Sequence, residues 1–192
     1  LNFYKMIGLS STGVDVDNYK KTFKRVEIKY ILNRDQKTAI LKAMKDHQAL
    51  DSYGRTKIRN VYFDDPTFIL ARRSNDHPTY KEKLRIRSYG EIKTGDDEVF
   101  IELKKKYDGI VYKRRITLDY ANTVKWLIDK EMMRAETQIE REISYMVSNY
   151  NDLKPRMFLS YEREAYYPVD GGDLRLTLDE NIRADINDAS LD

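Results

Sequence analysis

Charged side chains recur at every second position of the stretch VFIELKKKYDGIVYKRRITL, from Val99 to Leu118. Two runs typical of β-strands flank the dipeptide Asp108-Gly109, which favours a tight hairpin turn. One face of the two predicted strands carries the charged residues Glu102, Lys104, Lys106, Lys113 and Arg115. Same-sign charges that lie directly opposite on neighbouring strands repel each other. The hairpin therefore either turns this face to water or binds a polyanion on it.

The other predicted strands show the same bias. On their polar faces, ten basic residues stand against three acidic ones. The bases are Arg25, Lys29, Arg85, Arg87, Lys104, Lys106, Lys113, Arg115, Arg163 and Arg175, and the acids are Glu27, Glu102 and Asp179. The whole chain is nearly balanced, with 35 Lys and Arg against 32 Asp and Glu, so positive charge is segregated onto one side of the strands. A solvated sheet face is the simpler interpretation. Arginine, whose planar fork matches phosphate, favours a phosphate-binding face.

The hydrophobic periodicity of the sequence predicts more strands than helices. Alternation predicts strands over residues 23–32, 58–63, 81–89, 156–167 and 174–180, besides the hairpin over 99–118. Helical spacing predicts helices from Asn33, an N-cap with Gln36 completing a capping box, to about His47, and over 121–131 and 137–150, with a short helix or turn after Pro66. Residues 1–22 carry little pattern and are expected to form a lead-in segment. The fold class is therefore α+β with a mostly antiparallel sheet.

Composition excludes several classes of protein. The 192-residue chain has no cysteine, so disulfides and thiolate zinc sites are excluded and a reducing, cytoplasmic compartment is favoured. There is no run of about 18 apolar residues, so we expect no transmembrane segment in this chain. The near balance of charge provides no global polycation for nucleic acid.

Closure of the sheet into a barrel would place the basic face inside. Ten packed bases could not stay ionised there without counter-charge. A bound polyphosphate would supply that charge, and the three carboxylates could hold a divalent cation that bridges phosphate oxygens.

Six segments carry a resemblance to a known family. They are RVEIKY (25–30), NVYFDD (60–65), KLRIRSYG (83–90), FIELKKKYDGIVYKRR (100–115), YEREAY (161–166) and LRLTLDENIRA (174–184). In this order and spacing they resemble the triphosphate tunnel metalloenzyme (CYTH-like) superfamily, and within it the VTC (vacuolar transporter chaperone) polyphosphate polymerase domain of the short bacterial type.

The resemblance implies an antiparallel β-barrel tunnel with flanking helices, in which the γ-phosphate of ATP is transferred to a growing polyphosphate chain with Mn²⁺ or Mg²⁺ assisting. Carried over motif by motif, the implied phosphate-binding residues are Lys29, Arg85, Arg87, Lys104, Lys113, Arg163 and Arg175. Arg115 is added because it shares a face with Lys113. Arg85, Arg87 and Lys113 would take part in catalysis, and Glu27 and Glu102 would contact the metal.

The chain departs from the family pattern at two places. Arg25 stands where the wider tunnel group has the first glutamate of ExExK, which moves the prediction from phosphatases and cyclases towards polymerases. The family closes its barrel with a strand resembling LEIK, and no such segment precedes Asp192. We therefore expect residues 23–192 to form one tunnel domain that lacks its final strand.

Other functions stay open from the sequence. A tripolyphosphatase or nucleoside triphosphatase of the same fold would use water as acceptor, and a non-catalytic module would bind polyphosphate without reaction. Single-stranded RNA is disfavoured because aromatic residues do not alternate with the bases in a stacking pattern. The sequence leaves the oligomeric state, the choice of metal and a membrane partner undetermined, and the protein could act at the cytoplasmic face of a membrane.

Overall fold

The computed structural model describes residues 4–8, 28–76, 78–131, 135–150 and 152–191. Two compact units make up the chain. The first comprises Leu1–Lys57 and Tyr161–Ile182, and the second Ile58–Ser160 and Arg183–Asp192. The two long strands β8 (Lys154–Pro168) and β9 (Leu176–Asp185) contribute residues to both units, so each unit is built from segments far apart in the sequence.

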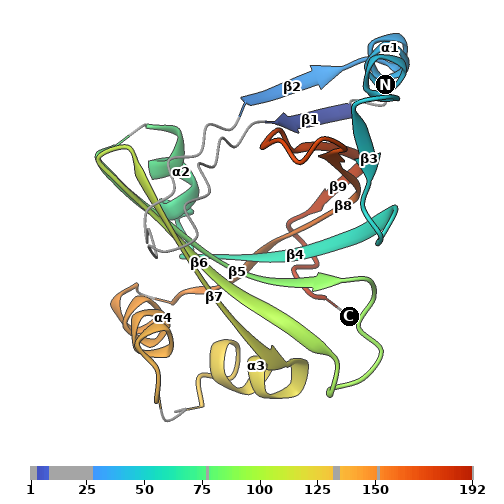
Figure 1. The fold of residues 1–192 in the computed structure, drawn as a ribbon. Helices are drawn as coiled ribbons and strands as arrows, with labels where there is room; N and C mark the ends of the chain where they lie inside the picture. Colours follow the sequence, from blue (N-terminus) through green and yellow to red (C-terminus); the bar gives the residue numbers. More distant parts are fainter. Residues whose placement is uncertain (1–3, 9–27, 77, 132–134, 151, 192) are drawn as a thin grey trace, which may run out of the picture. The chain divides into compact units, whose positions relative to one another are not determined.

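The first unit has the strand order β2-β1-β9-β8, with β3 paired to β8 (Figure 1). Its short strands are β1 (Tyr4–Gly8), β2 (Ile28–Leu32) and β3 (Gln48–Leu50). Strand β1 pairs antiparallel with both β2 and β9, with Ile7 opposite Lys29 on one side and Thr177 on the other. This strand lies within the segment 1–22, where the sequence predicted no element, because five residues without a clear period carry no signal of their own.

The helix of the first unit, α1 (Arg34–Met44), begins as predicted at Asn33. The Asn33 side chain accepts a hydrogen bond from the backbone N–H of Gln36, and the Gln36 side chain accepts one from the backbone N–H of Asn33, both at 2.9 Å. This capping box satisfies two of the N–H groups that a helix start leaves without partners. The helix ends at Met44, one turn earlier than predicted.

The second unit is built on a sheet with the order β8-β4-β5-β6-β7. Its further strands are β4 (Thr56–Asp64), β5 (Tyr80–Tyr89), β6 (Glu98–Tyr107) and β7 (Ile110–Asp119). Strands β5, β6 and β7 pair antiparallel over nearly their whole length. The predicted hairpin is present, and its turn residues Asp108 and Gly109 both have positive φ, at 44° and 79°. Positive φ at both central positions is what a type I′ hairpin turn requires, and it explains the Asp-Gly pair.

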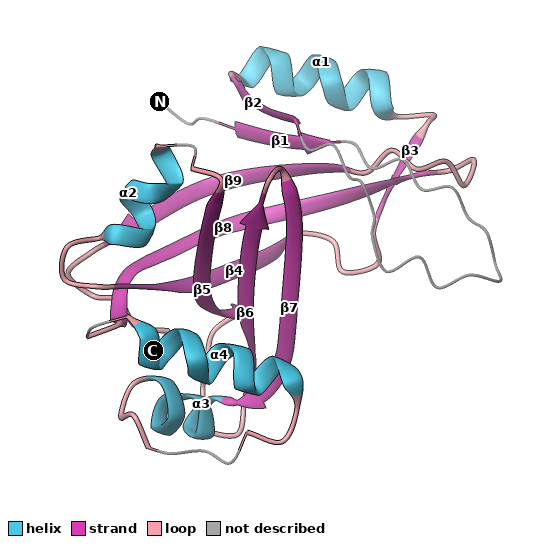
Figure 2. Cartoon of the chain, turned by 90° about the vertical axis from the view of Figure 1, so that its left-hand side faces the viewer, coloured by secondary structure: helices cyan, strands magenta, loops and turns pink. Residues whose placement is uncertain are grey.

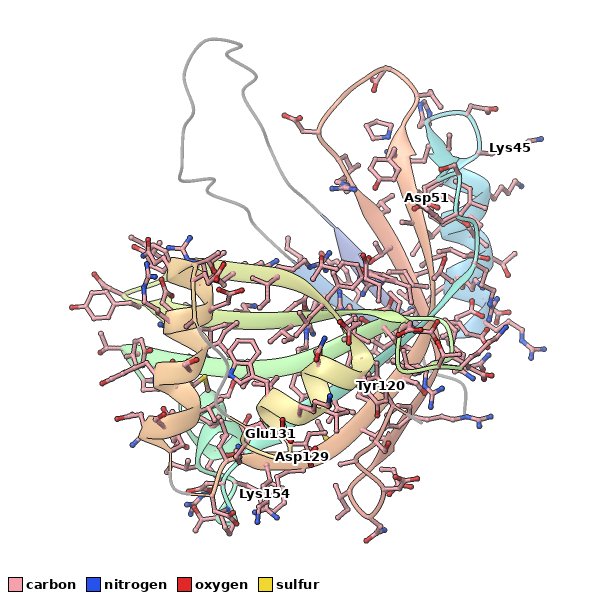
Figure 3. The ribbon with its side chains drawn as sticks, turned by 90° about the horizontal axis from the view of Figure 1, so that it is seen from below. Lys45, Asp51, Tyr120, Asp129, Glu131 and Lys154 are labelled. Atoms are coloured by element: carbon pink, nitrogen blue, oxygen red, sulfur yellow. The ribbon has the colours of Figure 1, made fainter. Side chains whose placement is uncertain are left out.

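Three helices accompany this sheet: α2 (Ile69–Asn75), α3 (Tyr120–Leu127) and α4 (Gln138–Asn149). Helix α2 contacts β5, α3 contacts β6 and β7, and α4 contacts β7. Figure 3 shows α3, which begins at Tyr120, and α4 lying against these strands. Trp126 and Leu127 of α3 and Ile143 and Met146 of α4 are buried in the core. The helices therefore cover one face of the sheet.

Side-chain alternation gives the sheet of the second unit two different faces. The face packed in the core carries Leu84 and Ile86 of β5 and Val99, Ile101 and Leu103 of β6, none of which is more than 1% exposed. The intervening residues point the other way and include the predicted bases of β5, β6 and β7. The apolar set thus fixes the register, since a slip of one residue would bring the bases into the core.

The architecture confirms the predicted α+β class with an antiparallel sheet and helices flanking it. The prediction that residues 23–192 form one tunnel domain stays a prediction. Within the described part of the chain, no helix is long and apolar enough to cross a membrane.

Truncation of a core residue should destabilise the second unit. Leu84 is 0% exposed, so Leu84→Ala should lower the free energy of unfolding by about 2–5 kcal/mol, the range for cavities left by large apolar residues. Ile186→Ala is the matched control, because Ile186 is 66% exposed and should change little. Urea unfolding followed by circular dichroism measures both. Equal effects of the two substitutions would contradict the assignment of the core face.

Candidate functional site

The register of β4 to β7 brings predicted site residues into one cross-strand row. Arg85 of β5 lies opposite Glu102 of β6, and Glu102 lies opposite Arg115 of β7. On the other side of β5, Tyr62 of β4 lies opposite Arg85. Residues directly opposite in an antiparallel pair have Cβ atoms about 5 Å apart, so these side chains can meet without any loop to position them.

The Glu102 carboxylate is the centre of this row. Its Oε2 accepts a hydrogen bond from Arg85 Nε at 2.6 Å and lies 2.5 Å from Arg85 Nη2. Its Oε1 accepts a hydrogen bond from Arg115 Nε at 2.8 Å and also contacts Arg115 Nη2. Arg87, one row along, brings its Nε to 3.9 Å from Oε2. One carboxylate therefore holds three guanidinium groups together.

Each of these arginines has a second polar contact. Arg85 Nη1 donates to the Tyr62 hydroxyl at 2.7 Å. Arg87 Nε donates to Asn60 Oδ1 at 2.9 Å, and Asn60 is itself fully buried and donates to the carbonyl of Leu159. These contacts fix the guanidinium planes before any ligand arrives. Asn60 and Tyr62 lie in the segment NVYFDD but were not predicted as part of the site. The polar residues at alternate positions of β4 were the available signal.

Aromatic rings also support the arginines. The Arg115 Cζ lies 4.6 Å from the ring centroid of Phe100, and Arg115 Nη2 donates to the Tyr89 hydroxyl at 3.2 Å. Arg87 Cζ lies 6.0 Å from the Tyr89 ring. A guanidinium over an aromatic face is stabilised by the ring quadrupole and keeps its N–H groups free to bond in its plane. Tyr89 and Phe100 were not predicted as part of the site.

The charges in the cluster alter the titration of its acids. Burial acts to raise the pKa of Glu102, but Arg85 and Arg87, together with the hydrogen bonds from Arg115 and Arg85, outweigh it and hold the pKa below its ordinary value. Burial likewise acts to raise the pKa of Tyr89, and the neighbouring Arg115 and Arg87 lower it instead. Glu102 is therefore ionised at neutral pH, and the cluster of three arginines and one carboxylate carries excess positive charge.

A row of lysines lies next to the arginine cluster on the same face. Lys83 of β5 pairs with Lys104 of β6, which pairs with Lys113 of β7. All three side chains are exposed. The three lysines lie side by side on neighbouring strands and their ammonium groups repel one another, and an anion bound across them would reduce this repulsion. Lys83 was not among the predicted site residues, although it stands two positions before Arg85 on the same strand face.

The first unit contains three other predicted residues. Arg163 of β8 forms a two-bond ion pair with Asp179 of β9, with Nε–Oδ1 and Nη2–Oδ2 distances of 2.6 and 2.8 Å. Arg175 lies just before β9 and stacks on Tyr167, with its Cζ 4.3 Å from the ring centroid. Lys29 is an exposed residue of β2. Asp179, which was predicted to be one of three carboxylates able to hold a cation, is thus the partner of Arg163.

The structure brings together six predicted site residues within the second unit: Arg85, Arg87, Glu102, Lys104, Lys113 and Arg115. Lys29, Arg163 and Arg175 belong to the first unit. Glu27, and with it Arg25, lies outside the described residues.

Few of the described side chains are placed to coordinate a divalent metal. Among the residues that the structure describes, no group of three or more His, Cys, Asp or Glu side chains could hold an ion. Glu102 offers a carboxylate, but its two oxygens already accept hydrogen bonds from Arg85 and Arg115. Mg²⁺ typically uses one or two protein carboxylates together with substrate phosphates and water. Glu102 could therefore contribute at most one ligand to a metal held chiefly by phosphate oxygens, and it is not the basis of an all-protein site.

The family model of the VTC domain matches residues 24–192. The search of curated proteins found no match. Among solved structures, a putative adenylate cyclase from Bacillus halodurans is similar, with a TM-score of 0.47 and 14% sequence identity over 78% of this chain and 76% of that chain.

Removal of the central carboxylate charge should destabilise the protein at neutral pH. Glu102→Gln leaves three guanidinium groups without their shared counter-ion, and we expect the free energy of unfolding to fall by about 2 kcal/mol, typical of hydrogen bonds to charged groups. Urea unfolding at pH 7 measures the loss. Glu98→Gln is the control, because Glu98 is an exposed residue of the same strand.

The pH dependence of that loss follows from the lowered pKa of Glu102. The stabilisation is fully present above the ordinary glutamate pKa of about 4.3 and is lost as the pH falls through the lower pKa of the folded state. The difference between wild type and Glu102→Gln should therefore shrink on acidification below that range. A difference that stays constant down to the acid limit of folding would contradict the ion-pair assignment.

Proposed function

Since the chain belongs to the VTC domain family, we propose that it is a polyphosphate polymerase, which transfers the γ-phosphate of ATP to the end of a growing polyphosphate chain. Family membership supports metal-dependent chemistry on phosphate chains at a general level. The choice of the polymerase reaction rests on the residues of the basic face and on Arg25 in the first motif.

The observation that carries the proposal is the convergence of Arg85, Arg87 and Arg115 on one point of the sheet face. Two guanidinium groups that bond to one carboxylate, with a third 3.9 Å from it, are close enough together to bind the oxygens of one phosphoryl group. Their planes are held by Tyr62, Asn60 and Tyr89, so little reorganisation is needed when a phosphate replaces part of the Glu102 contacts. Preorganised charge of this kind is the largest contribution that a protein makes to phosphoryl transfer.

The lysine row gives the site a second part. Lys104 and Lys113, with Lys83 beside them, lie one cross-strand row from the arginines. Rows on one face of a sheet are about 7 Å apart, a distance that a short run of linked phosphates can span. We assign the arginine cluster and Lys113 to the phosphoryl group in transfer, and Lys83 and Lys104 to neighbouring phosphates of the bound chain. Arg163, Arg175 and Lys29 are proposed as further phosphate contacts.

The reaction requires little else of the protein. Phosphoryl transfer needs the attacking and leaving oxygens in line and stabilisation of the negative charge that spreads over the equatorial oxygens. The acceptor is a terminal phosphate that is already ionised, so no general base and no protein nucleophile are required. Arg85, Arg87 and Lys113 are the residues that we expect to contact the phosphoryl group.

A divalent cation, Mn²⁺ or Mg²⁺, would neutralise part of the phosphate charge and polarise the phosphoryl oxygens when bound. Glu102 and Glu27 are the two proposed protein ligands of this cation. The use of ATP as substrate fits a cytoplasmic location or the cytoplasmic face of a membrane.

Arg87→Ala should abolish synthesis. Arg87 is 8% exposed and lies beside Glu102, so the substitution removes a preorganised charge from the reacting group, and we expect turnover to fall by more than about 100-fold. Polyphosphate formed from ATP is the readout, and unfolding in urea checks that the fold persists. Arg87→Lys keeps the charge without the planar fork and should also be strongly impaired. Arg34→Ala, on the exposed start of α1, is the control. Unchanged turnover in a folded Arg87→Ala variant would refute the assignment.

The reaction itself is distinguished by ³¹P NMR of ATP incubated with Mg²⁺ or Mn²⁺ and the protein. A growing resonance of internal phosphates together with ADP is the expected result. Orthophosphate with ADP would assign a hydrolase instead, because water would then be the acceptor. ATP resonances that broaden or shift without products would assign a binding module and contradict the polymerase.

A further inference from the structure

The tip of the β6–β7 hairpin carries exposed apolar residues that the proposed reaction does not use. The hairpin tip is defined here as residues 104–114, with the turn at Asp108 and Gly109. Figure 2 shows this turn at the end of the strands opposite to the end that leads into α3. Lys105 and Arg114 form ion pairs with Glu142 of α4, with Nζ–Oε2 and Nε–Oε1 distances of 3.3 and 3.7 Å. The two cross-strand pairs nearest the turn, Lys106–Val111 and Tyr107–Ile110, lie beyond these contacts.

Apolar and aromatic side chains are exposed in these last rows. Tyr107 is 57% exposed and lies opposite Ile110, which is 45% exposed. Val111 and Tyr112 follow at 43% and 44%, and Tyr80 of the adjacent strand lies beside Tyr107 at 41%. Single exposed apolar residues are ordinary on a protein surface, whereas several gathered at one end of a hairpin mark an interaction site. Tyr107 and Ile110 lie on one face of this hairpin and Val111 on the other, so both faces of the turn are apolar.

Basic residues surround this apolar group. Between positions 104 and 114 there are five bases, Lys104, Lys105, Lys106, Lys113 and Arg114, against one acid, Asp108. Glu142 of α4 faces two of them. Positive charge therefore remains on both strands, before and after the apolar residues at the turn. A complementary partner has an apolar region that is surrounded by negative charge.

We propose that the hairpin tip docks on the surface of an anionic phospholipid bilayer, with Ile110 and Val111 entering the boundary between headgroups and acyl chains. Tyr107 and Tyr112 would lie at headgroup level, where tyrosine concentrates because one end of the ring is apolar and the other polar. Lys105 and Lys106, to which the proposed reaction assigns no role, would face the anionic headgroups.

Two other occupants fit the tip less well. A second copy of this chain would bring two basic tips together in a symmetric contact, in which the like charges repel. A free polyphosphate would satisfy the lysines but offers nothing to Tyr107, Ile110 and Val111. A bilayer with anionic lipids satisfies both sets of side chains. The inference does not depend on the proposed reaction.

Sedimentation with lipid vesicles tests the proposal. The full chain should bind vesicles of phosphatidylcholine containing phosphatidylserine, bind phosphatidylcholine alone far more weakly, and be released by high salt. The double substitution Ile110→Ser with Val111→Ser should weaken binding to the anionic vesicles by roughly tenfold or more, because it removes the inserted apolar groups. Ile186→Ser, at a position that is 66% exposed elsewhere on the second unit, is the matched control and should bind as the wild type does.

Three results would overturn the proposal. The first is unaltered vesicle binding in the double variant, together with release of the wild type by soluble polyphosphate, which would make the lysines a general phosphate-binding surface. The second is the absence of binding to anionic vesicles. The third is a dimer of the wild type in analytical ultracentrifugation that the double variant loses, which would assign the tip to a second copy. Both residues are exposed, so the thermal unfolding of the variant should match that of the wild type.

Discussion

The contact on which the second unit's functional face depends is the shared carboxylate of Glu102. Bases on neighbouring strands of a sheet would repel, and the register places Arg85 and Arg115 on either side of the same residue. Because Glu102 bonds to both and has Arg87 within 4 Å, the three guanidinium groups can stay close with net positive charge left over. A core face packed with leucine, isoleucine and valine fixes the register that makes this contact, so the packing of one face determines the electrostatics of the other.

This arrangement also explains how the proposed phosphate site can be stable in the absence of phosphate. A cluster of arginines without counter-charge would cost free energy through repulsion and desolvation. One carboxylate reduces that cost but cannot neutralise three cations, and the phenol groups of Tyr62 and Tyr89 and the amide of Asn60 hold the guanidinium planes in position. The same logic recurs in the first unit, where Asp179 holds Arg163. The acids on the basic faces are candidate metal ligands, and they also hold the arginine side chains in position.

The basic face of strands β5, β6 and β7 divides into parts with different chemistry along the length of the strands. Near the middle, arginines with aromatic and amide partners form a rigid cluster; next to it lie three exposed lysines; and at the turn the bases surround exposed tyrosine and aliphatic side chains. Arginine presents a fixed fork and lysine a mobile point charge. A rigid arginine fork suits the proposed contact with a reacting phosphoryl group, whereas mobile lysines suit the proposed contacts with a moving phosphate chain or with lipid headgroups.

The sequence by itself determined the alternation of the strands, the capping box at Asn33, the Asp-Gly turn and the segregation of bases onto one strand face, because each depends on residues close together in the chain. It also supplied the motifs through which the family was identified. Only the tertiary structure decided that Glu102 faces arginines on both neighbouring strands, that Asn60, Tyr62 and Tyr89 hold them, that Lys83 joins the lysine row, and that Tyr4–Gly8 is a strand. These facts depend on which strands are neighbours and in which register. Register is set by packing of the whole core, which no local pattern contains.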